Sequence, residues 1–135
     1  MADLELITPP DLPRPAGYSH VAVVPAGHRL VWTSGQVPLD AGGDVVGPGN
    51  LEAQTRAVME HVGRALAAGG ASWSDVLKLT IYVTDTSALP VIRAVRDEFV
   101  DRDRPPTSSL VQVAALFRPD VLVEVEAVAA VGEPR

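Results

Sequence analysis

The spacing of hydrophobic and polar positions predicts two helices in this chain. Between residues 51 and 68, apolar or small residues recur at the three- and four-residue spacing of an amphipathic helix. Asn50 is suited to cap its N-terminus, and Gly69-Gly70 is suited to end it. A second, shorter helix is expected after Ser87, because Pro90 falls in the first turn, where no backbone N–H is required.

Five further segments have the pattern of β-strands. Residues 75–83 and 121–131 alternate between two faces, which is the two-residue period of a strand. The runs 20–24, 29–34 and 109–116 are rich in residues that favour strands. Only four residues separate the first two of these runs, so we expect them to form a hairpin.

The predicted order ββαβαββ indicates an α+β fold with both helices on one face of a single mixed sheet. In the last strand, one face is apolar and suited to lie beneath the helices. The other face has no helix to cover it and mixes aliphatic residues with two acids, so we expect it to meet another subunit. The apolar face carries Val121, Val123, Val125, Ala127 and Ala129. The mixed face carries Leu122, Glu124, Glu126 and Val128.

Composition narrows the possible chemistry. The chain has 135 residues and no cysteine, which excludes disulfides, thiolate nucleophiles and thiolate metal sites. Three histidines without metal-ligand spacing and a single lysine, Lys78, leave little support for a metal centre or for lysine chemistry. We therefore expect no metal.

Charge and hydropathy bear on partners and compartment. With 17 acidic and 11 basic residues, the net charge is −6, which argues against binding to nucleic acid or to an anionic membrane. The first residues lack the pattern of a signal peptide, and no apolar run approaches the ~20 residues of a membrane span. We expect one cytoplasmic domain over residues 1–135, with an extended, proline-rich lead-in over 1–17.

Several short motifs, in order along nearly the whole chain, resemble those of the Rid/YjgF family of reactive-intermediate (imine) deaminases, also called endoribonuclease L-PSP proteins. The most specific are Ser34-Gly35-Gln36-Val37-Pro38 and the Glu-x-Glu-Ala-x-Ala run that begins at Glu124. The others are Ala16-Gly17-Tyr18-Ser19, Gln54, Leu66–Gly70, Asp75–Thr80, Val83-Thr84-Asp85 and Pro106-Thr107-Ser108-Ser109.

The resemblance implies a chorismate-mutase-like subunit, with two helices on one face of a six-stranded sheet, assembled as a homotrimer with clefts between subunits. It also implies hydrolysis of 2-imino or 2-enamino acids without cofactor or metal. In that scheme Glu124 handles the attacking water, while Tyr18 and the backbone of Gly35 line the cleft. A small-molecule ligand is then the expected partner.

One departure from the family pattern bears on substrate choice. The arginine that holds the substrate carboxylate in the family falls on Ser108, which offers a hydroxyl and no charge. Arg93 occupies a pocket position that is usually small and polar, so it is either a replacement for the missing charge or a surface arginine paired with Asp97 four residues on. The turn over 116–120 also looks one residue longer than the family pattern.

Two functions remain open at this point. The first is a Rid-type hydrolase of an imine, enamine or related small metabolite, with Glu124 as the catalytic residue and Tyr18, Gly35, Arg93 and Ser108 as substrate-binding residues. The second is a trimeric protein that binds a small metabolite, or regulates a partner, without turnover. A ribonuclease is disfavoured by the acidic charge.

Overall fold

The computed structural model describes residues 4–132. Residues 1–3 of the expected lead-in and residues 133–135 of the expected domain lie outside the described residues. Two short 3₁₀ helices, η1 (Trp73–Asp75) and η2 (Thr86–Ala88), accompany the main elements. These are β1 (Glu5–Ile7), β2 (Val21–Val23), β3 (Arg29–Trp32), α1 (Leu51–Ala68), β4 (Val76–Val83), α2 (Leu89–Arg96), β5 (Thr107–Gln112) and β6 (Val123–Val131).

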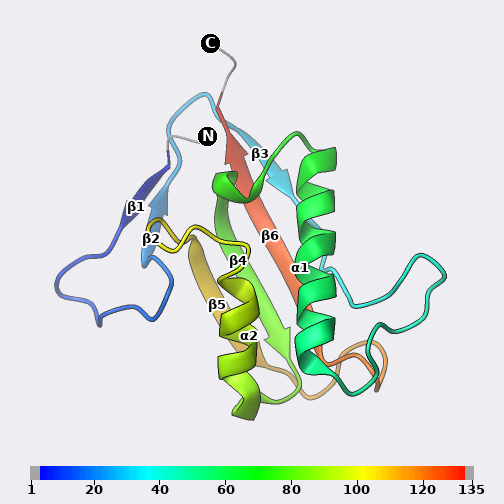
Figure 1. Cartoon of the computed structure of the whole chain (residues 1–135). Helices are drawn as coiled ribbons and strands as arrows, with labels where there is room; N and C mark the ends of the chain where they lie inside the picture. The colour runs from blue at the N-terminus through cyan, green and yellow to red at the C-terminus, as the bar shows by residue number, and fades with distance from the viewer. Residues whose placement is uncertain (1–3, 133–135) are drawn as a thin grey trace.

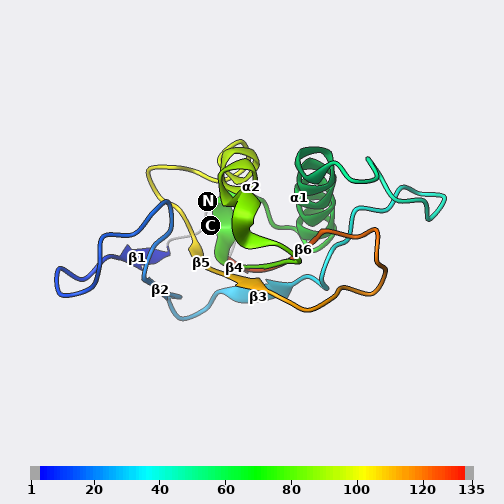
Figure 2. The same cartoon turned by 90° about the horizontal axis from the view of Figure 1, so that it is seen from below.

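The molecule has two layers, one of helices and one of strands. Helices α1 and α2 lie next to each other on the same face of the sheet (Figure 1), and Figure 2 shows both above the strands. A four-stranded sheet has the order β3-β6-β4-β5, with β4 and β5 parallel and the other pairs antiparallel. This arrangement confirms the predicted α+β class and the mixed sheet with both helices on one side.

The six strands do not form the single six-stranded sheet that the resemblance implies, but divide into that four-stranded sheet and a separate two-stranded sheet of β1 and β2. The predicted hairpin between 20–24 and 29–34 is therefore wrong, because β2 pairs with β1 and β3 pairs with β6. Residues 5–7, inside the proline-rich lead-in, supply the antiparallel partner of β2. A short connection favours a hairpin only when no other strand competes for the same edge.

Helix α1 begins and ends where the sequence predicts. The Asn50 side chain accepts a hydrogen bond from the N–H of Ala53 at 3.0 Å, satisfying one of the free donors of the first turn. Gly69 follows the last helical residue, and Gly70 has a φ of +78°, which a glycine adopts readily.

Helix α2 and strand β5 differ at their ends from the prediction. Ser87 does not cap the helix; its N–H donates to Asp85 at 2.8 Å within η2, and α2 begins at Leu89 with Pro90 in its first turn. The helix ends at Arg96. Strand β5 spans 107–112 rather than 109–116, so Ser108 is part of the strand.

The hydrophobic core lies between the sheet and the helices. As predicted, every second residue of β6 is buried there, and Val123 and Val125 are fully inaccessible to solvent. They share the core with Val58 and Val62 of α1 and with Ile92 of α2. The alternate residues of β6 face the opposite side, where Trp32 of β3 is 66% exposed and Leu30 is 45% exposed. Among the described residues, no helix is both long and apolar enough to cross a membrane.

Candidate functional site

Glu124 and Gly35 are in direct contact. Residues 34–36 continue past β3 along β6, where Gln36 and Val125 exchange two backbone hydrogen bonds of 2.8 and 3.1 Å. This pairing brings Gly35 beside the Glu124 side chain. A Cβ built on Gly35 would overlap Oε2 of Glu124, so the absence of a side chain at Gly35 is what makes room for the carboxylate.

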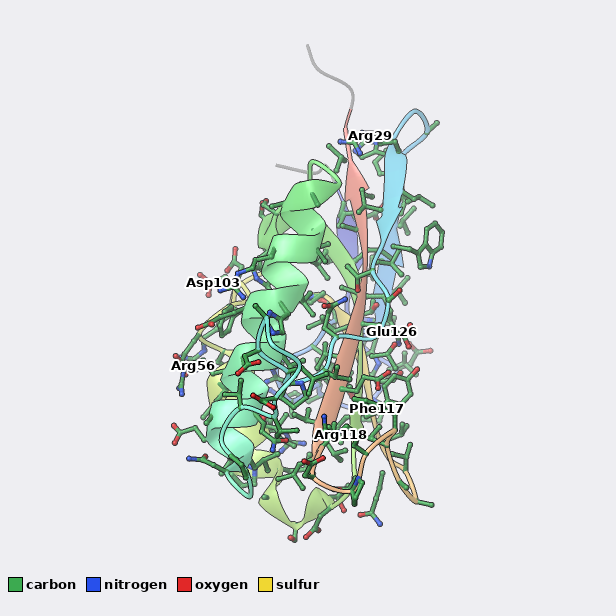
Figure 3. All side chains as sticks on the ribbon, turned by 90° about the vertical axis from the view of Figure 1, so that its right-hand side faces the viewer. Arg29, Arg56, Asp103, Phe117, Arg118 and Glu126 are labelled. Carbon is green, nitrogen blue, oxygen red and sulfur yellow. The ribbon has the colours of Figure 1, made fainter. Side chains whose placement is uncertain are left out.

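The surroundings of Glu124 favour its protonated form. Burial raises the pKa of Glu124 above the ordinary value of 4.5, and the nearby charge of Glu126 raises it further. Tyr82 lies opposite Glu124 in the β4–β6 pair, and its hydroxyl donates a hydrogen bond to Oε1 of Glu126. That bond is also the main cause of a raised pKa for Tyr82. In Figure 3, Glu126 lies on the side of β6 away from α1.

Three other predicted site residues line one cavity of about 170 Å³: Tyr18, Arg93 and Ser108. Ser108 pairs with Leu79 of β4, which is buried under the helices, so Ser108 faces the helix layer. The walls of the cavity come from α2, β4, β5 and the segment before β2. The apolar part of the lining is Ala16, Ile81, Leu89, Ile92 and Leu110.

Tyr18 is held at this cavity by its neighbours in the sequence. Ser19 binds the chain before β5 twice, through its N–H to Pro106 O at 3.1 Å and its hydroxyl to Pro105 O at 2.6 Å. The ring of His20 packs edge-to-face on Tyr18, with centroids 5.2 Å apart, and its Nε2 bonds to Pro13 O at 2.6 Å. His20 therefore supports the position of Tyr18.

The five predicted site residues thus form two groups on opposite faces of the sheet. Glu124 alternates with buried Val123 and Val125, so it points away from the helices. Ser108 points toward them. Within one copy of the chain, the cavity at Ser108 and the carboxylate of Glu124 are separated by the sheet itself. One subunit therefore presents two halves of the predicted site without joining them.

Sequence reasoning missed a further residue of the cavity, Arg96. It lies one turn after Arg93 on α2, lines the same cavity and is only 8% exposed. Asp97 pairs with Arg96 at 3.0 Å and not with Arg93, contrary to one of the two interpretations of Arg93. In the part of the chain that the structure describes, no carboxylate forms an ion pair with Arg93. The i, i+3 spacing of the two arginines was the available signal.

Comparison with known proteins identifies the family. The family model described as "Endoribonuclease L-PSP" matches residues 11–131, nearly the whole chain. The chain belongs to the Rid/YjgF family. Within residues 4–132, no three histidine, aspartate or glutamate side chains gather closely enough to hold a metal ion.

Relatives in the Rid/YjgF family include named deaminases and solved structures. The 3-aminoacrylate deaminase RutC of Acinetobacter baylyi is 37% identical over 127 residues, covering 93% of this chain and 96% of the relative. The structure of the Rid protein YyfB from Yersinia pestis has a TM-score of 0.82 at 29% identity and covers 96% of this chain and 99% of its own. Escherichia coli TdcF, solved with bound serine, has a TM-score of 0.70 at 36% identity, covering 81% and 85%.

Proposed function

We propose that this Rid/YjgF protein hydrolyses an imine or enamine of a small organic acid, with a substrate preference that differs from the family pattern because Ser108 stands where the arginine is expected. The observation that carries the proposal is the contact of Glu124 with Gly35, which leaves a partly desolvated carboxylate beside the Gly35 backbone. Relatives named as deaminases support the reaction class.

In the proposed reaction, Glu124 acts as the base for water. Its carboxylate accepts one proton from water while the water oxygen bonds to the imine carbon, and delivers that proton to the nitrogen to give a carbinolamine. The carboxylate then accepts the proton of the carbinolamine hydroxyl and passes it to the nitrogen, as the C–N bond breaks and the C=O bond forms. The products are a carbonyl compound and ammonia, which balances one imine and one water. The raised pKa of Glu124 brings that carboxyl closer to the range in which it exchanges protons efficiently near neutral pH.

We further propose that the complete site forms between copies of the chain, in a homotrimer. Two observations support this assembly. Glu124 and the cavity at Ser108 lie on opposite faces of one subunit, so only a second copy can bring such halves together. The face that carries Glu124 also exposes Trp32 and Leu30 of β3, which is typical of a surface that meets a partner.

The test of the function is turnover by the purified protein. It would be mixed with 2-iminobutyrate or 2-aminoacrylate generated in place, and with imines of larger aliphatic 2-oxo acids, while the release of the 2-oxo acid is followed. We expect faster release than without protein, and loss of the acceleration in Glu124→Gln. Gln112→Leu, at an exposed site on β5, is the matched control and should keep wild-type rates.

The second function, ligand binding without turnover, is favoured by one observation, the neutral side chain at Ser108 in a cavity that otherwise suits a small molecule. It predicts that a ligand raises the melting temperature while no imine is hydrolysed faster than in buffer. Equal hydrolysis by wild type and Glu124→Gln would contradict the assignment of Glu124.

A further inference from the structure

Positive charge gathers around one cavity of an acidic protein. Arg93 and Arg96 line the cavity at Ser108, and both also line an adjoining cavity of about 320 Å³ together with Arg102. The carboxylate of Asp97 is the one acidic group among the described residues that line these two cavities. Three guanidinium groups thus face one carboxylate, in a chain whose net charge is −6. Such an excess in a confined space favours an anionic ligand.

The Arg96 guanidinium is held in place with donors to spare. Its Nε and Nη2 atoms both donate to Oδ1 of Asp97, at 3.1 and 3.0 Å. Gly17, with a φ of +81°, lies so close above the guanidinium that a Cβ there would overlap Nη2. A guanidinium carries five N–H donors, so one carboxylate oxygen leaves most of them available to a ligand. Burial makes each remaining charge-assisted bond stronger than it would be in water.

The rest of the cavity is apolar and small. Ile81, Ile92 and Leu110 form much of its wall. At about 170 Å³ it is close to the size of a cavity that accepts benzene, about 150 Å³, so it suits a group of about six carbon atoms. The small, uncharged side chain of Ser108 leaves this space open.

We propose that Arg93 and Arg96 form the site for the carboxylate of the substrate, and that the preferred substrate is derived from an aliphatic 2-oxo acid of about six carbons. This inference rests on the proposed function for its link to catalysis. The charge that β5 lacks at Ser108 is supplied across the cavity by α2. The carboxylate lies against the two guanidinium groups, and the alkyl chain lies against the isoleucines and leucines.

Binding of a stable 2-oxo acid tests the proposal without requiring turnover. The probe is 4-methyl-2-oxopentanoate, compared by isothermal titration calorimetry with its neutral counterpart 4-methylpentan-2-one and with pyruvate. We expect the six-carbon acid to bind at least about tenfold more tightly than either, because the ketone lacks the carboxylate and pyruvate lacks the alkyl chain.

Arginine variants then locate the anion site. Arg93→Gln and Arg96→Gln should each weaken binding of the acid by about tenfold or more and leave the weak binding of the ketone unchanged. Arg64→Gln is the matched control, because Arg64 is an exposed arginine on α1 that lines neither cavity. Arg93 is exposed, so its variant should fold even if loss of the buried Arg96 prevents folding.

The outcomes separate this proposal from the proposed function. Unchanged affinity in Arg93→Gln, or equal binding of acid and ketone, would overturn the anion site whatever the enzyme hydrolyses. Tight, arginine-dependent binding without hydrolysis of the corresponding imine would support the anion site and contradict the deaminase.

Discussion

Replacing Gln54 with leucine would remove a buried connection between α1 and the chain that leads into β6. Gln54 is fully inaccessible to solvent. Its Oε1 accepts from the N–H of Leu122 at 2.9 Å, and its Nε2 donates to the carbonyl of Asp120 at 3.0 Å and, more weakly, to that of Gly47 at 3.4 Å. Leu122 directly precedes β6, two residues before Glu124, so this connection fixes where the strand that carries Glu124 begins.

The cost of the substitution follows from the groups that lose their partners. The Leu122 N–H and the Asp120 carbonyl would each be left without a bond, at about 1–3 kcal/mol for a buried group. The Gly47 bond is long and adds little. Partial relaxation of the carbonyl toward water and the added apolar surface of leucine reduce the total, giving a destabilisation of about 2–4 kcal/mol.

Thermal unfolding followed by circular dichroism measures this loss. An unfolding entropy of about 2.1 cal/mol/K per residue over 135 residues converts 1 kcal/mol into about 3.5 °C, so the melting temperature should fall by about 7–14 °C. The matched control is Gln112→Leu, whose exposed side chain accepts from Thr86 at 3.0 and 3.1 Å, where water can substitute. A fall below about 3 °C for Gln54→Leu, or an equal fall in the control, would refute the reasoning.

Three further predictions concern the face that carries Glu124. Because the pKa of Glu124 is raised in the folded state, the contribution of this carboxyl to stability should fall as pH rises above 4.5. Glu124→Gln should therefore be more stable than wild type at pH 7 and gain no advantage at pH 4, as measured by urea unfolding. Gly35→Ala should displace the carboxylate and lower kcat by about 10²-fold with an unchanged circular dichroism spectrum, whereas wild-type kcat would disprove the contact. In an absorbance titration, Tyr82→Phe should remove a tyrosine ionisation above pH 10 that Tyr18→Phe retains; its persistence in Tyr82→Phe would contradict the bond to Glu126.

The sequence was sufficient to predict those parts of the fold that local chemistry determines. Asn50 and the glycines at 69 and 70 marked the ends of α1, because helix capping and a left-handed backbone conformation depend on the residue type at the helix end itself. Alternation in β6 identified its buried face for the same reason. Strand pairing was different: whether residues 21–23 pair with 29–32 or with 5–7 depends on which edges meet in space.

In the predicted site, too, some residues could be identified from local sequence motifs and others only from the three-dimensional packing. Gly35 and Glu124 were identified from their motifs, and the structure brings them into contact. Arg96 was missed because an arginine followed by an aspartate on a short helix is an ordinary surface pattern. Only the position of α2 over β5, and of Gly17 over the guanidinium, makes it a buried residue of the cavity.

The same geometry explains how Ser108 is compatible with an anion site in this cavity. An arginine at 108 would bring a third guanidinium into about 170 Å³ that Arg93 and Arg96 already line, opposed by the single carboxylate of Asp97. Like charges at such distances repel strongly where water is scarce. A small neutral residue on β5 avoids that repulsion and leaves space for a ligand. What a ligand's carboxylate requires is positive charge directed into the cavity, and α2 can direct it there from the opposite wall.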